Sequence, residues 1–480
     1  MRFLLSLPPS LVTRFHTLTG LPRTEYFCTS DPVGRRLGSG GGTVWLLEQC
    51  HRRETPQADF PRWLSSKRRL LIHAGGQSRR LPAYAPIGKI LTPIPISTEG
   101  NGPLTSPTLL DLQRPLYERI MEHAPASLHT MVVSGDVLIR AGQLQNLPEA
   151  DVVCYGLPSE PTVATHHGVY VSRSETPDRL DFMLQKPPVE QLTQLSSTHR
   201  LLLDIGIWLL SDRAVERLRQ KCHAPDGTLR YYDLYADFGR ALGDHPSLPD
   251  PVLSDLSVAV RPLPEGEFYH YGTSADIIRS TAALLNRMGG SHCEKPQPSL
   301  FVQQSRVSRP FTAENHDIWV EHSVLGSGWQ LTAEHVITGV PENDWQITLP
   351  RGVCIDIIAL GERGYVLRPY GFHDAFRGSL TDSGTTFMGR PAIQWLAERS
   401  LAPHDIEGFE DIQTARLFPI VATIDQLGQM LHYMIDSPDM IDSPGHEDLR
   451  EVWMKAEKLA ADSLLLAAPS PALSQKEGRK

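Results

Sequence analysis

The sequence predicts an α/β protein with a mixed sheet, followed by a parallel β-helix domain and a short helical tail. Between Ser66 and about Gly290, short apolar runs alternate with helical stretches, which is typical of a layered α/β sheet. Farther along, large apolar residues recur every six positions with glycines among them, which indicates the corners of a β-helix more than an array of hairpins. These residues are Trp319, Leu325, Leu331 and Ile337.

The composition is that of a globular protein with two or three domains. Of 480 residues, 40% are hydrophobic and 21% are charged, and the net charge of -9 argues against a general nucleic-acid binder. None of the six cysteines forms a C-x-x-C pair, so neither a zinc site nor a disulfide framework is expected. No apolar run approaches the ~18 residues of a membrane span, and no secretory signal is recognised. A soluble cytoplasmic protein is therefore expected.

The changes of pattern along the chain predict five regions. A catalytic α/β domain comes first, then a polar linker, a β-helix-like domain, a mixed and helical region whose role is not readable, and a tail expected to be disordered. The predicted ranges are 1–290, 291–299, 300–375, 376–460 and 461–480.

The first segment contains a glycine-rich stretch that predicts a phosphate-binding turn. Thr43 would cap a helix through Val44–Leu47, and a helix N-terminus after glycines offers N–H groups to an anion. A flexible linker is the alternative. No Gly-Lys-Ser/Thr follows, so this is not a Walker A motif. The residues assigned to nucleotide binding here are Gly38, Ser39, Gly40, Gly41, Gly42 and Thr43.

A second loop, within Arg68–Pro95, combines glycines with cations. The apolar run Leu70–Ile72 predicts a buried strand, and the glycines after it leave the backbone accessible to a ligand. Cationic residues at the carboxyl end of a strand suit a polyphosphate. The predicted nucleotide-binding residues are Gly75, Gly76, Gln77 and Ser78, and the predicted catalytic cations are Arg80 and Lys89.

The stretch HAGGQSRRLPAYAPIGKILTPIP resembles the GGxGxRLxPxTxxxPK motif of sugar-1-phosphate nucleotidyltransferases. It is most similar to the fucose-1-phosphate guanylyltransferase (GDP-fucose pyrophosphorylase) branch, and within it to the pyrophosphorylase half of bacterial bifunctional fucokinase/GDP-fucose pyrophosphorylases. Ser78 replaces the third glycine, and Ile87-Gly88 separate the proline from Lys89, as in that branch. The glycine-rich GSGGGT is also similar to that branch. The resemblance implies a Rossmann-like, GT-A-like catalytic fold, often followed by a β-helix.

Further positions gain their predicted roles from this resemblance. Asp136 follows the strand-like run before Ser134-Gly135, and corresponds to the family's metal-binding aspartate. An aspartate that caps a turn is the alternative reading. Lys186 stands in a segment similar to E-K-P, where the lysine approaches the sugar phosphate. Asp204 and Gly206 lie in a strand similar to the one that faces the sugar.

Three histidines complete the predicted substrate site. His166 and His167 suit contacts with the sugar phosphate, or hydrogen bonds within a turn. His270 occupies the position where the family places a second metal-binding aspartate, so the second metal ligand stays open. The aromatic stretch from Tyr231 to Phe238 reads as a pocket wall more than as catalytic.

The implied reaction joins GTP to β-L-fucose 1-phosphate, with Mg²⁺ as the cofactor and pyrophosphate as the leaving group. Alternatives are a pyrophosphorylase with another base or sugar, a non-catalytic sugar-nucleotide sensor, and an acyltransferase that uses His322 or His335 of the β-helix. Bifunctional relatives continue into a kinase domain, and no kinase activity is expected of this chain. No nucleic-acid or membrane partner is expected, and a homo-oligomer is left open.

Overall fold

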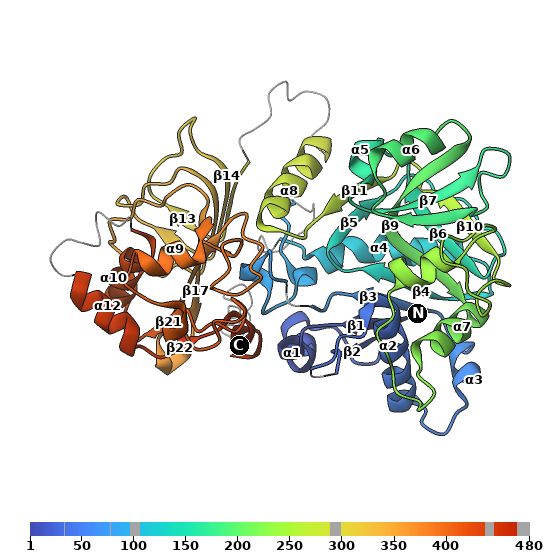
Figure 1. The fold of residues 1–480 in the computed structure, drawn as a ribbon, viewed down its shortest axis with the longest axis horizontal. Helices are drawn as coiled ribbons and strands as arrows, with labels where there is room; N and C mark the ends of the chain where they lie inside the picture. Colours follow the sequence, from blue (N-terminus) through green and yellow to red (C-terminus); the bar gives the residue numbers. More distant parts are fainter. Residues whose placement is uncertain (33, 77, 97–105, 289–298, 437–445, 468–480) are drawn as a thin grey trace. The chain divides into compact units, whose positions relative to one another are not determined.

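The computed structural model describes residues 1–32, 34–76, 78–96, 106–288, 299–436 and 446–467 (Figure 1). The chain forms two compact units. Unit 1 consists of Met1–Gly75 and Leu110–Phe268, and unit 2 of Gly76–Leu109 and Tyr269–Lys480. The chain therefore passes from one unit to the other inside the predicted nucleotide loop. The five regions expected from the sequence stay a prediction, and the expected linker and tail lie largely outside the described residues.

Unit 1 is built on a nine-stranded mixed sheet whose main path runs β10-β6-β9-β4-β3-β1-β2. Strands β2, β1, β3 and β4 are parallel to one another, whereas β9 is antiparallel to both β4 and β6. The predicted mixed α/β sheet is thus confirmed. The strands are β1 (Arg2–Ser6), β2 (Tyr26–Thr29), β3 (Arg69–His73), β4 (Leu128–Ser134), β6 (Val152–Leu157), β7 (Gly168–Arg173), β8 (Phe182–Gln185), β9 (His199–Ser211) and β10 (Val258–Pro262).

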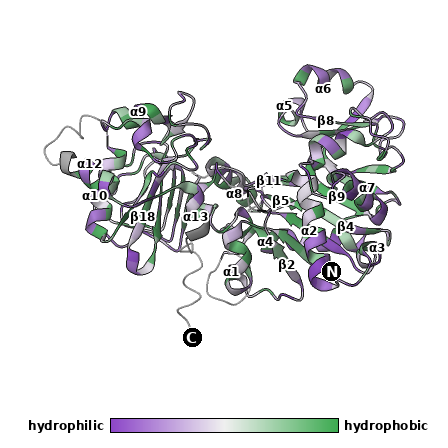
Figure 2. Ribbon diagram, turned by 60° about the horizontal axis from the view of Figure 1, so that its bottom comes forward, coloured by the Kyte–Doolittle hydropathy of each residue, from purple (hydrophilic) through white to green (hydrophobic). Residues whose placement is uncertain are grey.

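The helices of unit 1 pack on this sheet through apolar faces. In Figure 2 the strands around β4 are mostly green, because their residues are hydrophobic on both faces, as expected of a sheet covered by helices. Ser211 caps α7 by accepting a hydrogen bond from the Ala214 N–H. The helices are α1 (Pro9–Thr19), α2 (Gly38–Glu54), α3 (Phe60–Leu64), α4 (Leu109–Glu122), α5 (Pro161–Ala164), α6 (Val189–Leu195), α7 (Asp212–Cys222) and the π-helix η3 (Leu234–Phe238), which the 3₁₀ turn η4 (Gly239–Ala241) follows.

Unit 2 contains a seven-stranded sheet of order β12-β14-β16-β17-β18-β21-β22. The first four strands are parallel and the last four form antiparallel pairs. The strands are β12 (Leu300–Gln303), β14 (His316–Glu321), β16 (Ala333–Thr338), β17 (Val353–Ala359), β18 (Tyr365–Gly371), β21 (Phe418–Val421) and β22 (Lys458–Leu459). Two short pairs stand apart, β13 (Arg306–Val307) with β15 (Val324–Leu325) and β19 (Thr386–Phe387) with β20 (Arg390–Pro391).

The predicted parallel β-helix is not confirmed. The β12–β14 and β16–β17 pairs join residues eighteen positions apart, as Leu300 with Ile318, which is three times the six-residue repeat seen in the sequence. The β14–β16 pair joins residues seventeen positions apart, as Ile318 with His335. The pairing then turns antiparallel from β17 onward, where Val353 faces Gly371. A mixed sheet is the description that covers all these strands.

Helices and short turns complete unit 2. Trp395 and Trp453 are fully buried, with ring centroids 6.0 Å apart, and the Arg399 guanidinium lies 4.5 Å from the Trp395 ring centroid. The region 376–460 thus contains buried aromatic packing, which its mixed pattern did not reveal. The helices and turns are η1 (Pro82–Tyr84), η2 (Lys89–Leu91), α8 (Ser274–Met288), η5 (Gly361–Arg363), α9 (Ala392–Ala397), η6 (Pro403–Asp405), α10 (Ile424–Ile435), α12 (His446–Lys455) and α13 (Ala461–Ala467).

Two expectations from composition can be compared with the described residues. The five cysteines among them, all except Cys293, are free thiols. No helix in the described parts of the chain is long and apolar enough to cross a membrane.

Candidate functional site

The carboxyl ends of the parallel strands of unit 1 meet at one edge of the sheet. Ser6, Thr29, His73 and Ser134 end β1, β2, β3 and β4, and the register pairs Ser6 with Thr29 and His73 with Ser134. The antiparallel strand β9 brings Gly206 to the same edge, where an added Cβ would lie 3.5 Å from the Ser134 Cβ. Ligands of open α/β sheets bind at this edge.

Asp136 follows the end of β4 directly, as the sequence predicts. Its Oδ1 accepts a hydrogen bond of 2.7 Å from the Ser134 Oγ. The Gly135 N–H donates to the His73 carbonyl at 2.9 Å, and a Cβ on Gly135 would lie 2.6 Å from the Ala74 Cβ. Only glycine therefore lets β3 and β4 approach closely enough to hold Asp136 at this edge.

Asp204 and Gly206 form a tight turn within β9. The Gly206 N–H donates to the Asp204 Oδ1 at 2.8 Å, and Gly206 has a φ of +74°, which favours glycine. Burial raises the pKa of Asp204 to about 6, although the Gly206 hydrogen bond acts in the opposite direction. Asp204 is thus a partly protonated carboxyl close to neutral pH.

Two tyrosines interact electrostatically with these carboxylates, Tyr235, which the sequence assigned to a core or pocket wall, and Tyr117, to which it gave no role. Burial raises the pKa of Tyr235, on η3, well above its usual value, and the charges of Asp204 and Asp136 add to the effect. Burial together with the charge of Asp136 also raises the pKa of Tyr117, on α4, whose hydroxyl finds no hydrogen-bond partner among the described residues. The aromatic stretch around Tyr235 was read as a pocket wall, and Tyr117 sits in an ordinary amphipathic helix.

The glycine-rich stretch is not the turn that the sequence predicts. Gly38–Glu54 is one helix, α2, and the residues Gly38 to Thr43 form its beginning. The N–H groups of Gly40 and Gly41 both donate to the Tyr232 carbonyl at 3.0 Å, so a backbone oxygen occupies the donors that were assigned to a phosphate.

Close packing explains why this helix begins with glycines. A Cβ on Gly38 would lie 2.6 Å from the Tyr232 oxygen, and Cβ atoms on Gly40 and Gly41 would lie 3.0 Å from backbone oxygens. Ser39 also joins the start of α2 to the segment after Tyr232, because its Oγ donates to Asp233 and accepts from the Leu234 N–H. Thr43 does not cap a helix; its Oγ1 donates to the Ser39 carbonyl and lies 2.8 Å from the His73 Nε2.

The nucleotide loop after β3 crosses from one unit to the other. Gly75 belongs to unit 1, where a Cβ would lie 3.0 Å from the Ser6 Oγ. Gly76 (φ +98°) and Ser78 (φ +46°) belong to unit 2, and both have left-handed backbone conformations. Gln77 lies outside the described residues.

Unit 2 brings together the predicted cations and the segment 272–274, which follows His270. The Lys89 Nζ donates to the Gly272 carbonyl at 2.9 Å, and the Ser274 N–H donates to the Arg80 carbonyl at 3.0 Å. Asp276, near the start of α8, lies 3.3 Å from the His270 Nδ1.

Asp276 is another residue that the sequence reasoning missed. Its burial is outweighed by hydrogen bonds from His270 and Thr273 and by the positive charge of Arg80, so its pKa is lowered. Asp276 is therefore an ionised carboxylate among the predicted cations. Asp276 lies four residues after Gly272. The stretch that resembles the family motif ends at Ser274, so Asp276 falls just beyond it.

The predicted sugar-phosphate residues of the β7–β8 region lie close to one another. The Lys186 N–H donates to the His167 carbonyl at 2.9 Å, and Lys186 has a φ of +50°. The His166 and Lys186 side chains are exposed, and the His167 ring lies edge-on 5.8 Å from that of Phe268. An exposed lysine beside two histidines is compatible with an anionic ligand.

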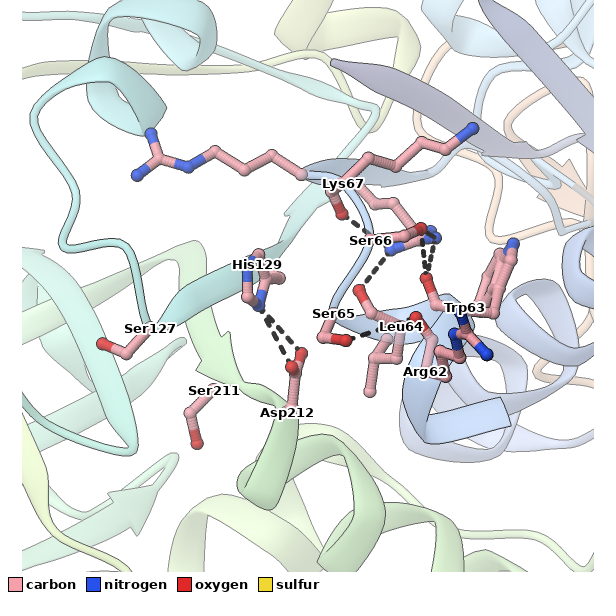
Figure 3. Close-up of polar contacts among 12 residues, drawn as sticks. Arg62, Trp63, Leu64, Ser65, Ser66, Lys67, Ser127, His129, Ser211 and Asp212 are labelled. Atoms are coloured by element: carbon pink, nitrogen blue, oxygen red, sulfur yellow. Dashed lines mark hydrogen bonds and ion pairs between the residues drawn. The ribbon is translucent and has the colours of Figure 1, made fainter. Parts of the chain in front are cut away.

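A separate polar cluster occupies the opposite edge of the sheet, where β4 begins (Figure 3). The His129 Nδ1 lies 3.1 Å from both carboxylate oxygens of Asp212, at the start of α7. The buried Arg69 donates to the carbonyls of Trp63 and Leu64, which end α3. The Arg69 hydrogen bonds satisfy carbonyl groups at the end of helix α3, so we interpret this cluster as structural.

Neither histidine of the acyltransferase alternative is positioned for catalysis. His335 is fully buried, its Nδ1 lies 2.8 Å from the Val353 carbonyl, and burial lowers its pKa to about 4. His322 lies beside Glu321, with its Nε2 3.5 Å from the carboxylate, and burial lowers its pKa. A buried histidine whose ring nitrogens are already engaged cannot deprotonate a substrate.

A model of the fucose pyrophosphorylase domain matches residues 62–249 and 251–423, which is well over half of the chain. The chain belongs to the fucose pyrophosphorylase family. The resemblance seen in the sequence is thereby confirmed. The matched residues include Asp136, Lys186 and Asp204 of unit 1 and the cationic loop of unit 2, whereas the glycine-rich start of α2 precedes the match.

Curated relatives extend this family assignment. The chain is 50% identical over 476 residues to the L-fucokinase/L-fucose-1-P guanylyltransferase of Bacteroides fragilis, covering 98% of this chain and 50% of the relative. It is 23% identical over 515 residues to the bifunctional fucokinase/GDP-fucose pyrophosphorylase of Arabidopsis thaliana, covering 92% and 47%. It is 28% identical over 186 residues to the fucose-1-phosphate guanylyltransferase of Mus musculus, covering 37% and 30%. The chain spans about half the length of the first two.

Proposed function

We propose that this fucose pyrophosphorylase family member transfers a guanylyl group from GTP to β-L-fucose 1-phosphate, releasing pyrophosphate and GDP-fucose. The observation that carries the proposal is the match to a bacterial fucose-1-phosphate guanylyltransferase at 50% identity over nearly the whole chain. The positive charges of Arg80, Lys89 and Lys186 support an anionic substrate. The choice of guanine as the base and fucose as the sugar rests on the names of the relatives.

The reaction is an in-line displacement at phosphorus. A phosphate oxygen of the sugar phosphate bonds to the α-phosphorus of GTP, while the bond from the α-phosphorus to the bridging oxygen breaks and pyrophosphate leaves. The attacking oxygen is already anionic, so no general base is required. The protein must hold two anions that repel each other and stabilise the charge that develops on the leaving group. Arg80 and Lys89 are the cations proposed for this work.

Mg²⁺ is proposed to bind at Asp136. Magnesium binds commonly through one or two carboxylates together with substrate phosphates, and keeps several waters. Asp136 is a partly exposed carboxylate at the carboxyl edge of the sheet, which fits that donor set. The described residues contain no group of three or more His, Cys, Asp or Glu placed to hold a metal, so the remaining ligands would come from the nucleotide and water. Mg²⁺ would neutralise phosphate charge.

The sugar phosphate is proposed to contact Lys186 through its exposed ammonium, and the sugar hydroxyls are proposed to contact Asp204. The buried Asp204 carboxyl, with its raised pKa, would accept or donate a hydrogen bond near neutral pH. The expectation that this chain lacks kinase activity stays a prediction.

One assay tests the proposed function. Purified chain is incubated with Mg²⁺ and each pairing of GTP, UTP or ATP with fucose, glucose or mannose 1-phosphate, and pyrophosphate release is measured. The expected result is the highest kcat/KM with GTP and β-L-fucose 1-phosphate, with GDP-fucose identified by mass. Equal or better turnover of another pair would assign the chain to a different pyrophosphorylase. Binding without turnover of any pair would favour a sugar-nucleotide sensor.

A further inference from the structure

A buried carboxylate of the unit 2 sheet contacts the segment between the two proposed catalytic cations. The Tyr84 hydroxyl, on η1, donates a hydrogen bond to the Glu321 Oε2 at the end of β14. It also accepts one of 2.8 Å from the Trp319 Nε1, which lies 3.3 Å from the same Glu321 oxygen. All three side chains are buried. Glu321 thus fixes the position of Tyr84, four residues after Arg80.

A buried arginine contacts the same short turn. The Arg368 side chain, on β18, is 1% exposed and donates to the Pro82 carbonyl at 2.7 Å. Its Nε donates to the Asp356 Oδ2 at 3.0 Å, and Asp356 accepts a further hydrogen bond of 2.6 Å from Thr338. Pro82 and Tyr84 are therefore held by two charged side chains from different strands of the sheet.

The ends of the segment are held as well. The Arg80 carbonyl accepts from the Ser274 N–H, and the Lys89 Nζ donates to the Gly272 carbonyl. Together with the two contacts in the middle, these bonds tie the main chain from Arg80 to Lys89 to unit 2. This explains why Gly76–Leu109 forms one compact unit with the C-terminal part of the chain.

Stability alone is a poor reason for this arrangement. A buried charge pays a large desolvation penalty, and apolar residues of similar size commonly give an equal or more stable core. Burial raises the pKa of Glu321 to about 7, which reflects that penalty. What the carboxylate and the guanidinium provide instead is directional bonding to a polar turn that has no regular strand partners.

We infer that Glu321 and Arg368 are positioning residues that fix the segment carrying Arg80 and Lys89, so that the sheet of unit 2 is part of the catalytic apparatus. The expected effect on catalysis rests on the proposed function. The fixed position of the segment rests on the structure alone. Neither residue touches substrate in this scheme. Both act through the two cations.

The first test is kinetic and uses Tyr84→Phe, which removes one hydroxyl and keeps the ring. Small displacements of catalytic groups cost up to about 10²-fold in rate. We expect kcat to fall by roughly 10- to 100-fold with Tyr84→Phe and by a similar factor with Glu321→Ala, with partial rescue in Glu321→Gln. The control is Ile357→Val, a buried change on β17 that removes one carbon and none of the hydrogen bonds described above. Its kcat should stay within two-fold.

A double-mutant cycle separates positioning from a general loss of structure. If Tyr84 acts through Arg80 and Lys89, Tyr84→Phe should have little further effect on kcat in a background that carries both Arg80→Ala and Lys89→Ala, because the groups it positions are gone. Additive losses in kcat would overturn the inference. Loss of activity in Ile357→Val equal to that in Tyr84→Phe would overturn it too.

Hydrogen exchange tests the mechanical part without any assay of activity. In Tyr84→Phe, Glu321→Gln and Arg368→Lys, amides between Arg80 and Leu91 should exchange at least ten-fold faster than in the parent, and more than the rest of unit 2. Ile357→Val should not show this pattern. Unchanged exchange in that segment would overturn the inference, whatever the substrate proves to be. Absence of guanylyl transfer by the parent would instead overturn the proposed function.

Discussion

Lys89 and Gly272 are joined by a hydrogen bond of 2.9 Å from the lysine Nζ to the glycine carbonyl, although 183 residues separate them in the sequence. The bond orients a long, flexible side chain that would otherwise sample many rotamers. Preorganisation of this kind is what the stabilisation of a developing charge requires.

Lys89→Ala should lower kcat much more than it changes either KM. Charge develops on the departing pyrophosphate, so the lost interaction is strongest in the transition state. Loss of one charge-assisted contact costs on the order of 1.5–3 kcal/mol, which corresponds to a fall of about 10- to 150-fold. Steady-state kinetics, run after checking that the variant melts like the parent, measure the effect. A variant with parental kcat and a raised KM would refute the role.

Lys186→Ala should instead raise the KM for the sugar phosphate, with a smaller change in kcat and little in the KM for the nucleotide. The exposed lysine is proposed to hold an anion whose charge changes less during the reaction. The matched control is Lys67→Ala, because Lys67 is also an exposed lysine of unit 1, paired at 3.6 Å with Glu54. If only the nucleotide KM shifts, our placement of Lys186 is wrong.

Asp136→Asn should weaken the response to Mg²⁺. A neutral amide keeps the size of the side chain and can still accept from the Ser134 hydroxyl, but it is a poorer ligand for a hard cation. We expect the Mg²⁺ concentration for half-maximal rate to rise at least ten-fold and maximal kcat to fall. Asp233→Asn serves as the control, because Asp233 caps η3. An unchanged Mg²⁺ profile for Asp136→Asn would place the metal elsewhere.

Asp204 predicts a pH dependence of stability. Its folded pKa of about 6 lies above the unfolded value of about 4, so the folded chain keeps a proton that the unfolded chain releases. The corresponding stability is present below pH 4 and is lost as the pH rises through 6, by roughly 2–3 kcal/mol. In Asp204→Asn this fall in stability with rising pH should be absent, because an asparagine side chain does not titrate.

Denaturant unfolding of the parent and of Asp204→Asn, at pH 4 and pH 7, measures this difference. The free energy of unfolding of the variant relative to the parent should be higher at pH 7 than at pH 4. The amide oxygen still accepts from the Gly206 N–H, so the turn is preserved. Parallel pH profiles for the two proteins would show that Asp204 titrates normally.

The start of α2 can be tested with alanine at two glycines. Gly38→Ala places a Cβ 2.6 Å from the Tyr232 oxygen at a φ of +73°, so it should cost about 1–3 kcal/mol of stability. Gly42→Ala finds its nearest neighbour at 3.5 Å within a helix, so it should be neutral or stabilise the fold by up to about 1 kcal/mol. Equal tolerance of both substitutions would contradict the contact with Tyr232.

Local pattern was sufficient for strands β3 and β4 and for the residues at their ends. The runs before Gly75 and before Gly135 are short and apolar and end in glycine, so β3 and β4 and the position of Asp136 could be predicted. Such strands depend on residues that are adjacent in the chain. The alternation in Ser66–Gly290 likewise predicted a layered sheet, because burial on both faces selects apolar residues throughout.

The helix at Gly38–Thr43 could not be predicted in this way. Glycine has a poor helix propensity, so four glycines in six residues indicate a turn. The helix forms because the Tyr232 carbonyl, about 190 residues away, accepts from its first N–H groups and leaves no space for a Cβ. A contact at that distance in the chain leaves no periodic trace in the local sequence.

The sequence by itself determined the family, the mixed sheet of unit 1 and the cations of the nucleotide loop, because each of these is written in consecutive residues. Only the tertiary structure decided that Gly76–Leu109 folds with the C-terminal sheet, since Tyr84 contacts Glu321, which lies 237 positions farther along the chain. A buried polar turn requires hydrogen-bond partners, and here Glu321 and Arg368 provide them from strands that are distant in the sequence. The proposed role of that sheet in positioning Arg80 and Lys89 rests on these long-range contacts, which cannot be read from any single stretch of the sequence.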